Sequence, residues 1–138
     1  MSTLYEGWVL EHSQAPHHEG PLDEATHEAR CDNPLCGDRV TVRVVLEDDR
    51  IAKIRFQARS CAVATASASR MTDLALGLSR TDATALATRA RQGVDPKQPA
   101  PEPPLEHLAI VRDVRSRRRC ATLAWEALEQ ALNAPETA

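Results

Sequence analysis

The sequence predicts an α+β fold, in which helices pack on one face of a small three-stranded antiparallel sheet. Apolar and polar residues alternate with period two through residues 40–46 and again through residues 52–56, which is typical of half-buried strands. Later segments space their apolar residues three or four positions apart, as one face of a helix requires. Because the strands come first and most of the helices follow, the helices are expected to cover one face of an antiparallel sheet.

The two strands are expected to form a hairpin. Asp48 and Asp49 lie between them and supply a tight connection. A weaker alternating pattern over residues 25–31 adds a third strand. The apolar face of the hairpin is predicted to carry Val40, Val42, Val44, Leu46, Ala52, Ile54 and Phe56.

Four segments have helical spacing. The first covers residues 3–13, where Thr3 and Glu6 have the spacing of a capping box and Tyr5, Trp8, Val9 and His12 share one face. The others are residues 62–79, a helix that Thr81 caps and that ends near Gly93, and residues 117–133, with Leu123, Ala124, Ala127, Leu128, Ala131 and Leu132 facing inward.

The chain is expected to form one domain over residues 1–138, with a surface insertion at about 94–104. A length of 138 residues suits a single hydrophobic core, and neither flank of the insertion is large enough to be a domain alone. The insertion excludes regular helix or strand because it contains Pro96, Pro99, Pro101, Pro103 and Pro104.

Composition excludes several classes of function. A net charge of −3 gives no electrostatic basis for binding nucleic acid. No apolar stretch approaches the roughly 18 residues that a membrane span needs, and no secretory signal pattern is visible, so a cytoplasmic protein is expected. In that compartment the four cysteines are expected to be metal ligands or reactive thiols rather than disulfides.

The segment Asn33-Pro34-Leu35-Cys36-Gly37-Asp38 is a candidate metal-binding loop. A thiolate and a carboxylate two positions apart, on a loop that Pro34 stiffens and Gly37 loosens, can point at one small ion. Both groups are ligands of zinc, and thiolates also hold iron–sulfur clusters. The tripeptide is common, however, and an aspartate that builds a turn explains Asp38 equally well.

Two further cysteines lie where helices are predicted to begin. Cys61 follows the second strand of the hairpin, and Cys120 falls in the first turn of the last helix. The amino terminus of a helix stabilises an anion and lowers the pKa of a thiol, so both residues are placed to be thiolates. The alternative is that both are small buried hydrophobic residues, as free cysteines often are.

Three segments resemble, in order, the signatures of the SufU/IscU/NifU-N family of iron–sulfur cluster assembly proteins. Residues 33–40 (NPLCGDRV) resemble the N-P-x-C-G-D signature, and residues 60–71 (SCAVATASASRM) resemble the second cysteine segment with its A-S-A-S-x-M ending. Residues 117–128 (RRRCATLAWEAL) resemble the R-x-K-C-A-T-L-x-W-x-x-L segment around the third cysteine. Residues 4–24 fit the amino-terminal helix and loop of the family, so the resemblance covers nearly the whole chain.

The resemblance implies a scaffold or sulfur acceptor rather than an enzyme with its own small-molecule substrate. In this family a cysteine desulfurase of the SufS or IscS type delivers persulfide sulfur, and zinc or a transient [2Fe–2S] cluster is bound before transfer to apo iron–sulfur proteins or carriers. Cys36, Asp38, Cys61 and Cys120 match the ligand positions, Cys36 is the expected sulfur acceptor, and Arg117 matches an arginine near the site. The long segment between Cys61 and Cys120, and Arg119 in place of a histidine, are similar to the SufU branch.

Other interpretations of these residues remain. A zinc-binding structural or interaction module without sulfur chemistry would use the same ligands, and a hydrolase would pair Cys36 with a histidine. Cys31 is either a spare thiol or a plain strand residue. Metal binding by His17, His18 and His27 is an alternative, but because they lie among loop acids they are expected in solvated loops, and nothing is predicted to pair with His107.

Overall fold

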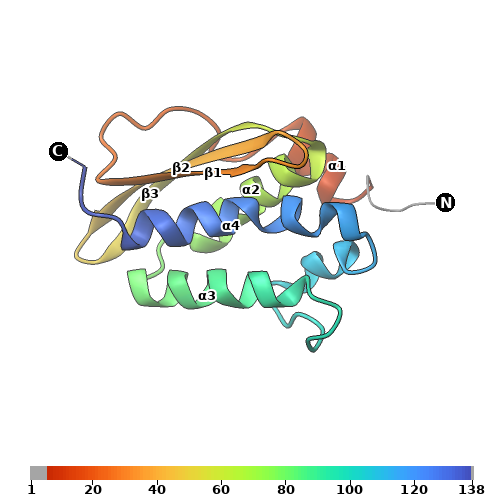
Figure 1. The fold of residues 1–138 in the computed structure, drawn as a ribbon. Coiled ribbons are helices and arrows are strands. Elements are labelled where there is room, and N and C mark those ends of the chain that lie inside the picture. The colour runs from red at the N-terminus through yellow and green to blue at the C-terminus, as the bar shows by residue number, and fades with distance from the viewer. Residues whose placement is uncertain (1–5, 138) are drawn as a thin grey trace.

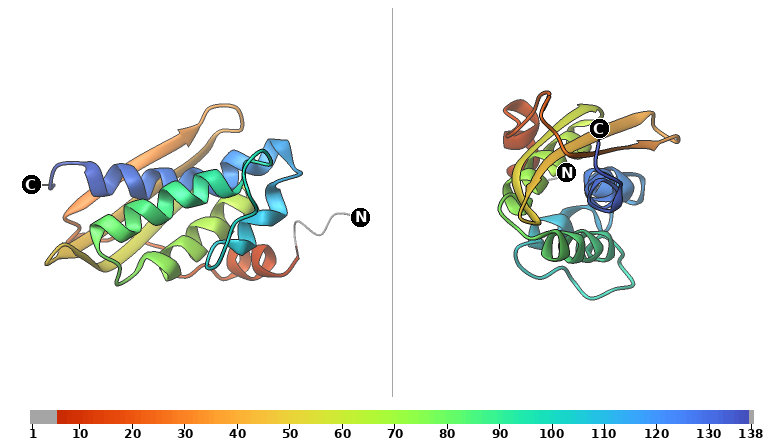
Figure 2. Two further views of the ribbon diagram at one scale, coloured as in Figure 1. Left: turned by 90° about the horizontal axis from the view of Figure 1, so that it is seen from below. Right: turned by 90° about the vertical axis from the view of Figure 1, so that its left-hand side faces the viewer.

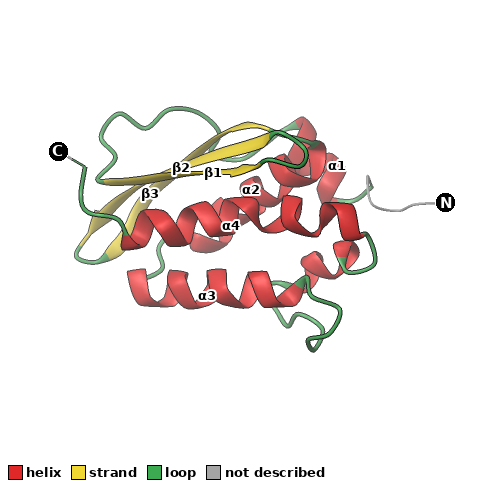
Figure 3. Cartoon of the chain, in the orientation of Figure 1, coloured by secondary structure: helices red, strands yellow, loops and turns green. Residues whose placement is uncertain are grey.

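A three-stranded antiparallel sheet forms one layer of the protein. The structure, a computed structural model, describes residues 6–137. The strands β1 (His27–Asn33), β2 (Asp38–Glu47) and β3 (Arg50–Arg59) lie in the order β1-β2-β3 (Figures 1 and 3). Each pair is antiparallel, with His27 opposite Val44 in one ladder and Arg39 opposite Arg59 in the other. The predicted sheet is therefore confirmed, and its first strand begins two residues later than expected.

The β2–β3 hairpin closes through the predicted aspartate pair but contains a bulge. Asp48 and Asp49 have φ angles of 52° and 62°, as a tight hairpin turn of matching twist requires. Leu46 pairs with Ile51 while Val45 pairs with Lys53, so Ala52 is an extra residue on β3. The prediction that Ala52 faces the core is wrong, because the bulge moves Ile51 into the core and leaves Ala52 exposed.

Helices cover one face of this sheet in two further layers. Helices α2 (Ala62–Ala75) and α4 (Arg118–Asn133) pack against the strands, and α3 (Arg80–Gly93) lies on the far side of α4 (Figure 2). The short α1 (Trp8–Gln14) packs on α2. The predicted α+β architecture is confirmed.

Three helix boundaries in the structure differ from the predicted ones. Helix α1 begins at Trp8, after Gly7 with a φ of 58°. The predicted capping box includes Thr3, which lies outside the described residues, as does Tyr5. Helix α2 ends at Ala75, because Leu76 leaves helical geometry and Gly77 follows with a φ of 88°. The cap of α3 is Ser79, whose hydroxyl accepts a hydrogen bond from the Asp82 amide at 3.1 Å, so Thr81 is not the cap.

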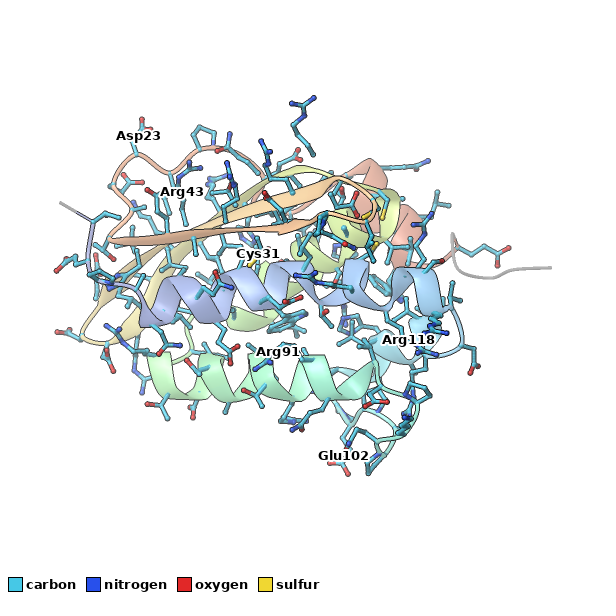
Figure 4. All side chains as sticks on the ribbon, in the orientation of Figure 1. Asp23, Cys31, Arg43, Arg91, Glu102 and Arg118 are labelled. Atoms are coloured by element: carbon cyan, nitrogen blue, oxygen red, sulfur yellow. The ribbon has the colours of Figure 1, made fainter. Side chains whose placement is uncertain are left out.

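The proline-rich segment joins α3 to two short 3₁₀ helices, η1 (Glu106–Val111) and η2 (Arg115–Arg117). Most residues from 95 to 104 are exposed, and Glu102 lies at the outer end of this connection (Figure 4). Pro101 packs on Gly93 so closely that a Cβ added to Gly93 would lie 2.9 Å from the Cβ of Pro101. The buried residues of η1, which the sequence did not predict as an element, are Leu108 and Val111.

The core lies between the sheet and the helices and is mainly aliphatic. Phe56 and Trp125 are its two fully buried aromatic residues among those described. The six residues of the last helix that were predicted to face inward are all buried. Within residues 6–137, no helix is both long and apolar enough to cross a membrane.

Candidate metal centre

The turn between β1 and β2 presents Cys36 to solvent and Asp38 to the interior. The carbonyl of Asn33 accepts hydrogen bonds from the amides of Cys36 (3.3 Å) and Gly37 (2.8 Å), and its side-chain oxygen accepts one from Leu35 (3.2 Å). Gly37 has a φ of 76°, which favours glycine and lets the chain reverse there. As a result Cys36 is exposed on the turn, while Asp38, the first residue of β2, is only 6% exposed.

Helix termini supply the other two cysteines. Cys61 is the N-cap of α2, and its amide donates a hydrogen bond to Asp38 Oδ1 at 3.1 Å. Cys120 lies in the first turn of α4 and is fully buried. The turn that carries Asp38 is thus fixed directly to the start of α2, a contact that the sequence did not predict.

Three of the four predicted ligands converge. The sulfur atoms of Cys36 and Cys120 and a carboxylate oxygen of Asp38 all lie within 4.8 Å of one another. Cys61 lies next to this group, since its amide donates to Asp38 Oδ1 and its thiol interacts with that of Cys120. We call this set, Cys36, Asp38, Cys61 and Cys120, the cysteine centre.

The two inner thiols act as a pair in proton binding. The hydrogen bond from Cys120 stabilises the Cys61 thiolate and lowers the pKa of Cys61 to about 7, and the amide of Ala64 at the start of α2 acts in the same direction. The same hydrogen bond, together with burial, raises the pKa of Cys120. The pair therefore loses one proton easily and retains the second until a cation replaces it.

Asp38 has one oxygen without a partner. Its Oδ2 is buried and accepts no hydrogen bond from the described residues, although Oδ1 is bonded to Cys61. A buried carboxylate oxygen without a donor or cation is costly. Three thiols and a carboxylate with one buried, unpartnered oxygen fit a tetrahedral zinc ion, and the thiols also suit an iron–sulfur cluster.

The other candidate thiol and the arginine lie on β1 and at the start of α4. Cys31 is a buried residue of β1 that faces α4 (Figure 4), and burial raises its pKa, so it is a strand residue of the core. Arg117 is the partly buried N-cap of α4, three positions before Cys120. Its predicted supporting role remains a prediction.

The histidines depart only in part from the predicted solvated loops: His17 is exposed in a turn, as expected, whereas His18 is partly buried. His17 bonds Asp73, and His18 bonds Thr72, so both side chains are fixed on α2. His27 is a buried residue of β1. His107, for which no partner was predicted, contacts Arg70 and stacks edge-on against Trp8 with ring centroids 4.9 Å apart. The sequence placed these histidines among loop acids and gave no sign that the loop packs on α2.

Comparison with known proteins gives the family. The model of the NifU-like N-terminal domain family matches residues 4–136. A curated relative, the iron–sulfur cluster assembly scaffold protein IscU of Streptococcus pyogenes serotype M1, is 37% identical over 135 residues, covering 96% of this chain and 84% of the relative. The zinc-dependent sulfurtransferase SufU of Bacillus subtilis is 29% identical over 133 residues, covering 94% of this chain and 90% of that protein.

A solved structure shares the fold. The amino-terminal part of a nitrogen-fixing NifU-like protein from Brucella abortus superposes with a TM-score of 0.85 at 24% identity, covering 94% of this chain and 92% of that one. This similarity supports the architecture described above and extends over nearly all of both chains.

Proposed function

Because the chain belongs to the NifU-like N-terminal domain family, we propose that it is an iron–sulfur cluster assembly protein. In this proposal it accepts sulfur from a cysteine desulfurase and holds zinc or a nascent [2Fe–2S] cluster at the cysteine centre. Downstream apo iron–sulfur proteins or carriers would receive the product. The relatives named as an assembly scaffold and as a zinc-dependent sulfurtransferase support both halves of this role.

One observation carries the proposal. Cys36, Cys120 and Asp38 place their ligand atoms within 4.8 Å of one another, and a buried oxygen of Asp38 lacks a partner among the described residues. Thiol and carboxylate groups that merely filled space would have no reason to converge beside a buried, unsatisfied oxygen. This arrangement supports a cation site.

Cys36 is the residue placed to accept sulfur. It is exposed on a turn, whereas Cys120 is buried and Cys61 is held at the N-cap of α2. The Cys36 thiolate would attack the outer sulfur of the persulfide on the desulfurase. A new S–S bond forms at Cys36 as the S–S bond of the desulfurase breaks, and the desulfurase cysteine leaves as a thiolate.

The two inner thiolates, of Cys61 and Cys120, stay in place while Cys36 reacts. A bound zinc ion supplies charge that keeps the cysteines deprotonated at neutral pH. Asp38 is held by the Cys61 amide through Oδ1, and its carboxylate is a harder and weaker ligand for zinc than the thiolates. It is therefore the position where ligands exchange most easily.

Two alternatives predict different behaviour. A purely structural zinc module needs a closed, inert site, and the exposure of Cys36 favours a reactive one. A cysteine hydrolase needs a histidine beside its nucleophile. All five histidines have hydrogen-bond partners elsewhere, on α2 or beside Thr26 and Arg70, and the sulfur of Cys36 contacts the Asn33 carbonyl at 3.9 Å.

The proposal is tested by locating transferred sulfur. The zinc-loaded protein is incubated with a cysteine desulfurase and cysteine, alkylated, and analysed by mass spectrometry, and a persulfide is expected on Cys36. Cys36→Ser should abolish labelling, and the control Cys31→Ser should leave it unchanged. Visible absorption of the anaerobically purified protein separates bound zinc from a cluster. Persulfide found only on Cys61 would overturn the role of Cys36. So would a protein that carries no persulfide at all when the same desulfurase labels another acceptor.

A further inference from the structure

A second group of metal-ligating side chains lies outside the cysteine centre, where the loop after α1 meets α2. His12, His17 and Asp73 each bring one ligand atom to within 4.8 Å of the others. We propose that these three residues form a second site, open to solvent, for a borderline divalent metal ion such as Zn²⁺ or Fe²⁺. Two imidazoles and a carboxylate suit such ions, whereas Mg²⁺ and Ca²⁺ prefer oxygen ligands alone.

A hydrogen bond to one ring nitrogen orients the imidazole of His12, as is typical of metal-binding histidines. It lies in the last turn of α1, is 7% exposed, and shares a hydrogen bond of 2.6 Å between its Nδ1 and the hydroxyl of Ser69. Histidine ligands typically fix one ring nitrogen in such a bond while the other binds the metal. Ser69 itself is fully buried in α2, so the imidazole is oriented by a rigid partner.

His17 is held from the backbone as well as the side chain. Its amide donates to the same Ser69 hydroxyl at 2.7 Å, and the next residue pairs with β3 through a 3.0 Å hydrogen bond from the Phe56 amide to the His18 carbonyl. Its Nδ1 lies 2.6 Å from Asp73 Oδ2, and its ring centroid lies 4.5 Å from that of His12. The loop is therefore held between α2 and β3, and all three groups are brought close together before any ion binds.

The dimensions allow an ion after small rotations of side chains. Ligand atoms around a tetrahedral zinc ion lie about 3.3 Å apart, given bond lengths near 2.0 Å. The 2.6 Å contact between His17 and Asp73 must open slightly, and the wider separations within 4.8 Å must close. The ion pair alone does not account for the arrangement, because His17 and Asp73 have side-chain exposures of 53% and 34% and exposed pairs stabilise a fold very little.

The two sites are separate. Cys61 caps the start of α2 and Asp73 lies near its end, so about 18 Å of helix separates them at 1.5 Å per residue. No residue of one set belongs to the other. The second site is therefore independent of the sulfur-transfer role proposed above, and either can fail without the other.

The test counts metal ions on the full-length protein. The cysteine centre is first loaded with one equivalent of zinc, and Co²⁺ is then titrated as a coloured probe that binds less tightly than zinc and does not displace it. Wild type should bind one Co²⁺ per chain, with ligand-field bands but no thiolate charge-transfer band. Asp73→Asn and His17→Gln should each abolish this binding, and Ser69→Ala should weaken it roughly 10–100-fold.

Matched controls separate the site from general effects. Asp23→Asn alters an exposed loop acid and should leave Co²⁺ binding unchanged. Cys31→Ser alters a thiol outside both sites and should leave the thiolate-free Co²⁺ spectrum intact. Because His17 and Asp73 are exposed, their variants are expected to fold, and circular dichroism checks this. Failure of wild type to bind Co²⁺, or equal binding by wild type, Asp73→Asn and His17→Gln, would overturn the second site.

Discussion

Replacement of Asp38 distinguishes a metal ligand from a structural cap. The carboxylate has two separate tasks in the structure: Oδ1 accepts the amide of Cys61 at 3.1 Å, and the buried Oδ2 has no partner within residues 6–137. Asp38→Asn retains an acceptor for Cys61 but places a non-ligating amide group where Oδ2 stood. Asp38→Ala removes both. The two variants therefore separate the cap from the ligand.

The expected magnitudes follow from these contacts. Loss of a hydrogen bond to a charged acceptor should cost Asp38→Ala about 1.5–3 kcal/mol of apoprotein stability, offset in part by removal of the buried unpaired oxygen. Asp38→Asn should change that stability by less than about 1 kcal/mol. A site of three thiolates and one carboxylate around Zn²⁺ has a net charge of about −2, and the three thiolates should retain the metal in both variants.

Turnover decides between the two interpretations. If Asp38 is the exchangeable ligand, both variants should slow desulfurase-coupled sulfur acceptance or cluster release, although only Asp38→Ala lowers the melting temperature of the apoprotein. Turnover is followed by sulfide release with a reductant, and stability by thermal melts of metal-free protein. Unchanged turnover in Asp38→Asn, or complete loss of its metal, would refute the reasoning.

Three further predictions concern features around the site. Burial, and to a smaller extent Arg70, lowers the pKa of His107 to about 4. The unfolded chain therefore takes up a proton at His107 first, and up to about 3 kcal/mol of unfolding free energy is lost as the pH falls from 6.5 to 4. His107→Asn should reduce this dependence of the unfolding free energy on pH in denaturant melts, and an unchanged dependence would contradict the prediction. Removal of the exposed residues 96–100 should leave metal binding and cooperative unfolding intact, provided that the contact between Pro101 and Gly93 is kept. Loss of cooperative unfolding would show that the segment belongs to the core. Leu35 is 95% exposed beside Cys36, as expected of a side chain that contacts the desulfurase, so Leu35→Asp should slow sulfur transfer without loss of metal. The control Leu10→Asp should leave the transfer rate unchanged, and equal effects of the two variants would exclude a specific contact at Leu35.

The regular elements could be predicted because local pattern determines them. Alternation through β2 as far as Val44 and helical spacing through α4 agree with the side chains that are buried, whereas at the end of β2 Val45 is buried and Leu46 only partly so. The bulge at Ala52 could not be predicted, because only the pairing of Val45 and Leu46 with β3 reveals the extra residue. The start of α3 was misplaced because Ser79 and Thr81 are both good caps, and only the backbone geometry selects Ser79.

The residues of the candidate site could be predicted from local motifs, but their arrangement in space could not. Sequence motifs identified Cys36, Asp38, Cys61 and Cys120 as ligand candidates, but periodicity and spacing alone did not exclude that the cysteines were core residues. Their convergence depends on long-range packing of the β1–β2 turn against the starts of α2 and α4. The position of His17 beside Asp73 depends in the same way on how the loop after α1 lies on α2, which no local pattern encodes.

In the proposed cysteine centre one metal ion is held by three thiolates and one carboxylate. Zinc-edge X-ray absorption of protein loaded with a single equivalent of zinc measures this ligand set directly. About three sulfur ligands near 2.3 Å and one oxygen ligand near 2.0–2.2 Å are expected. A first shell dominated by nitrogen and oxygen, or one with fewer than three sulfur atoms, would contradict it.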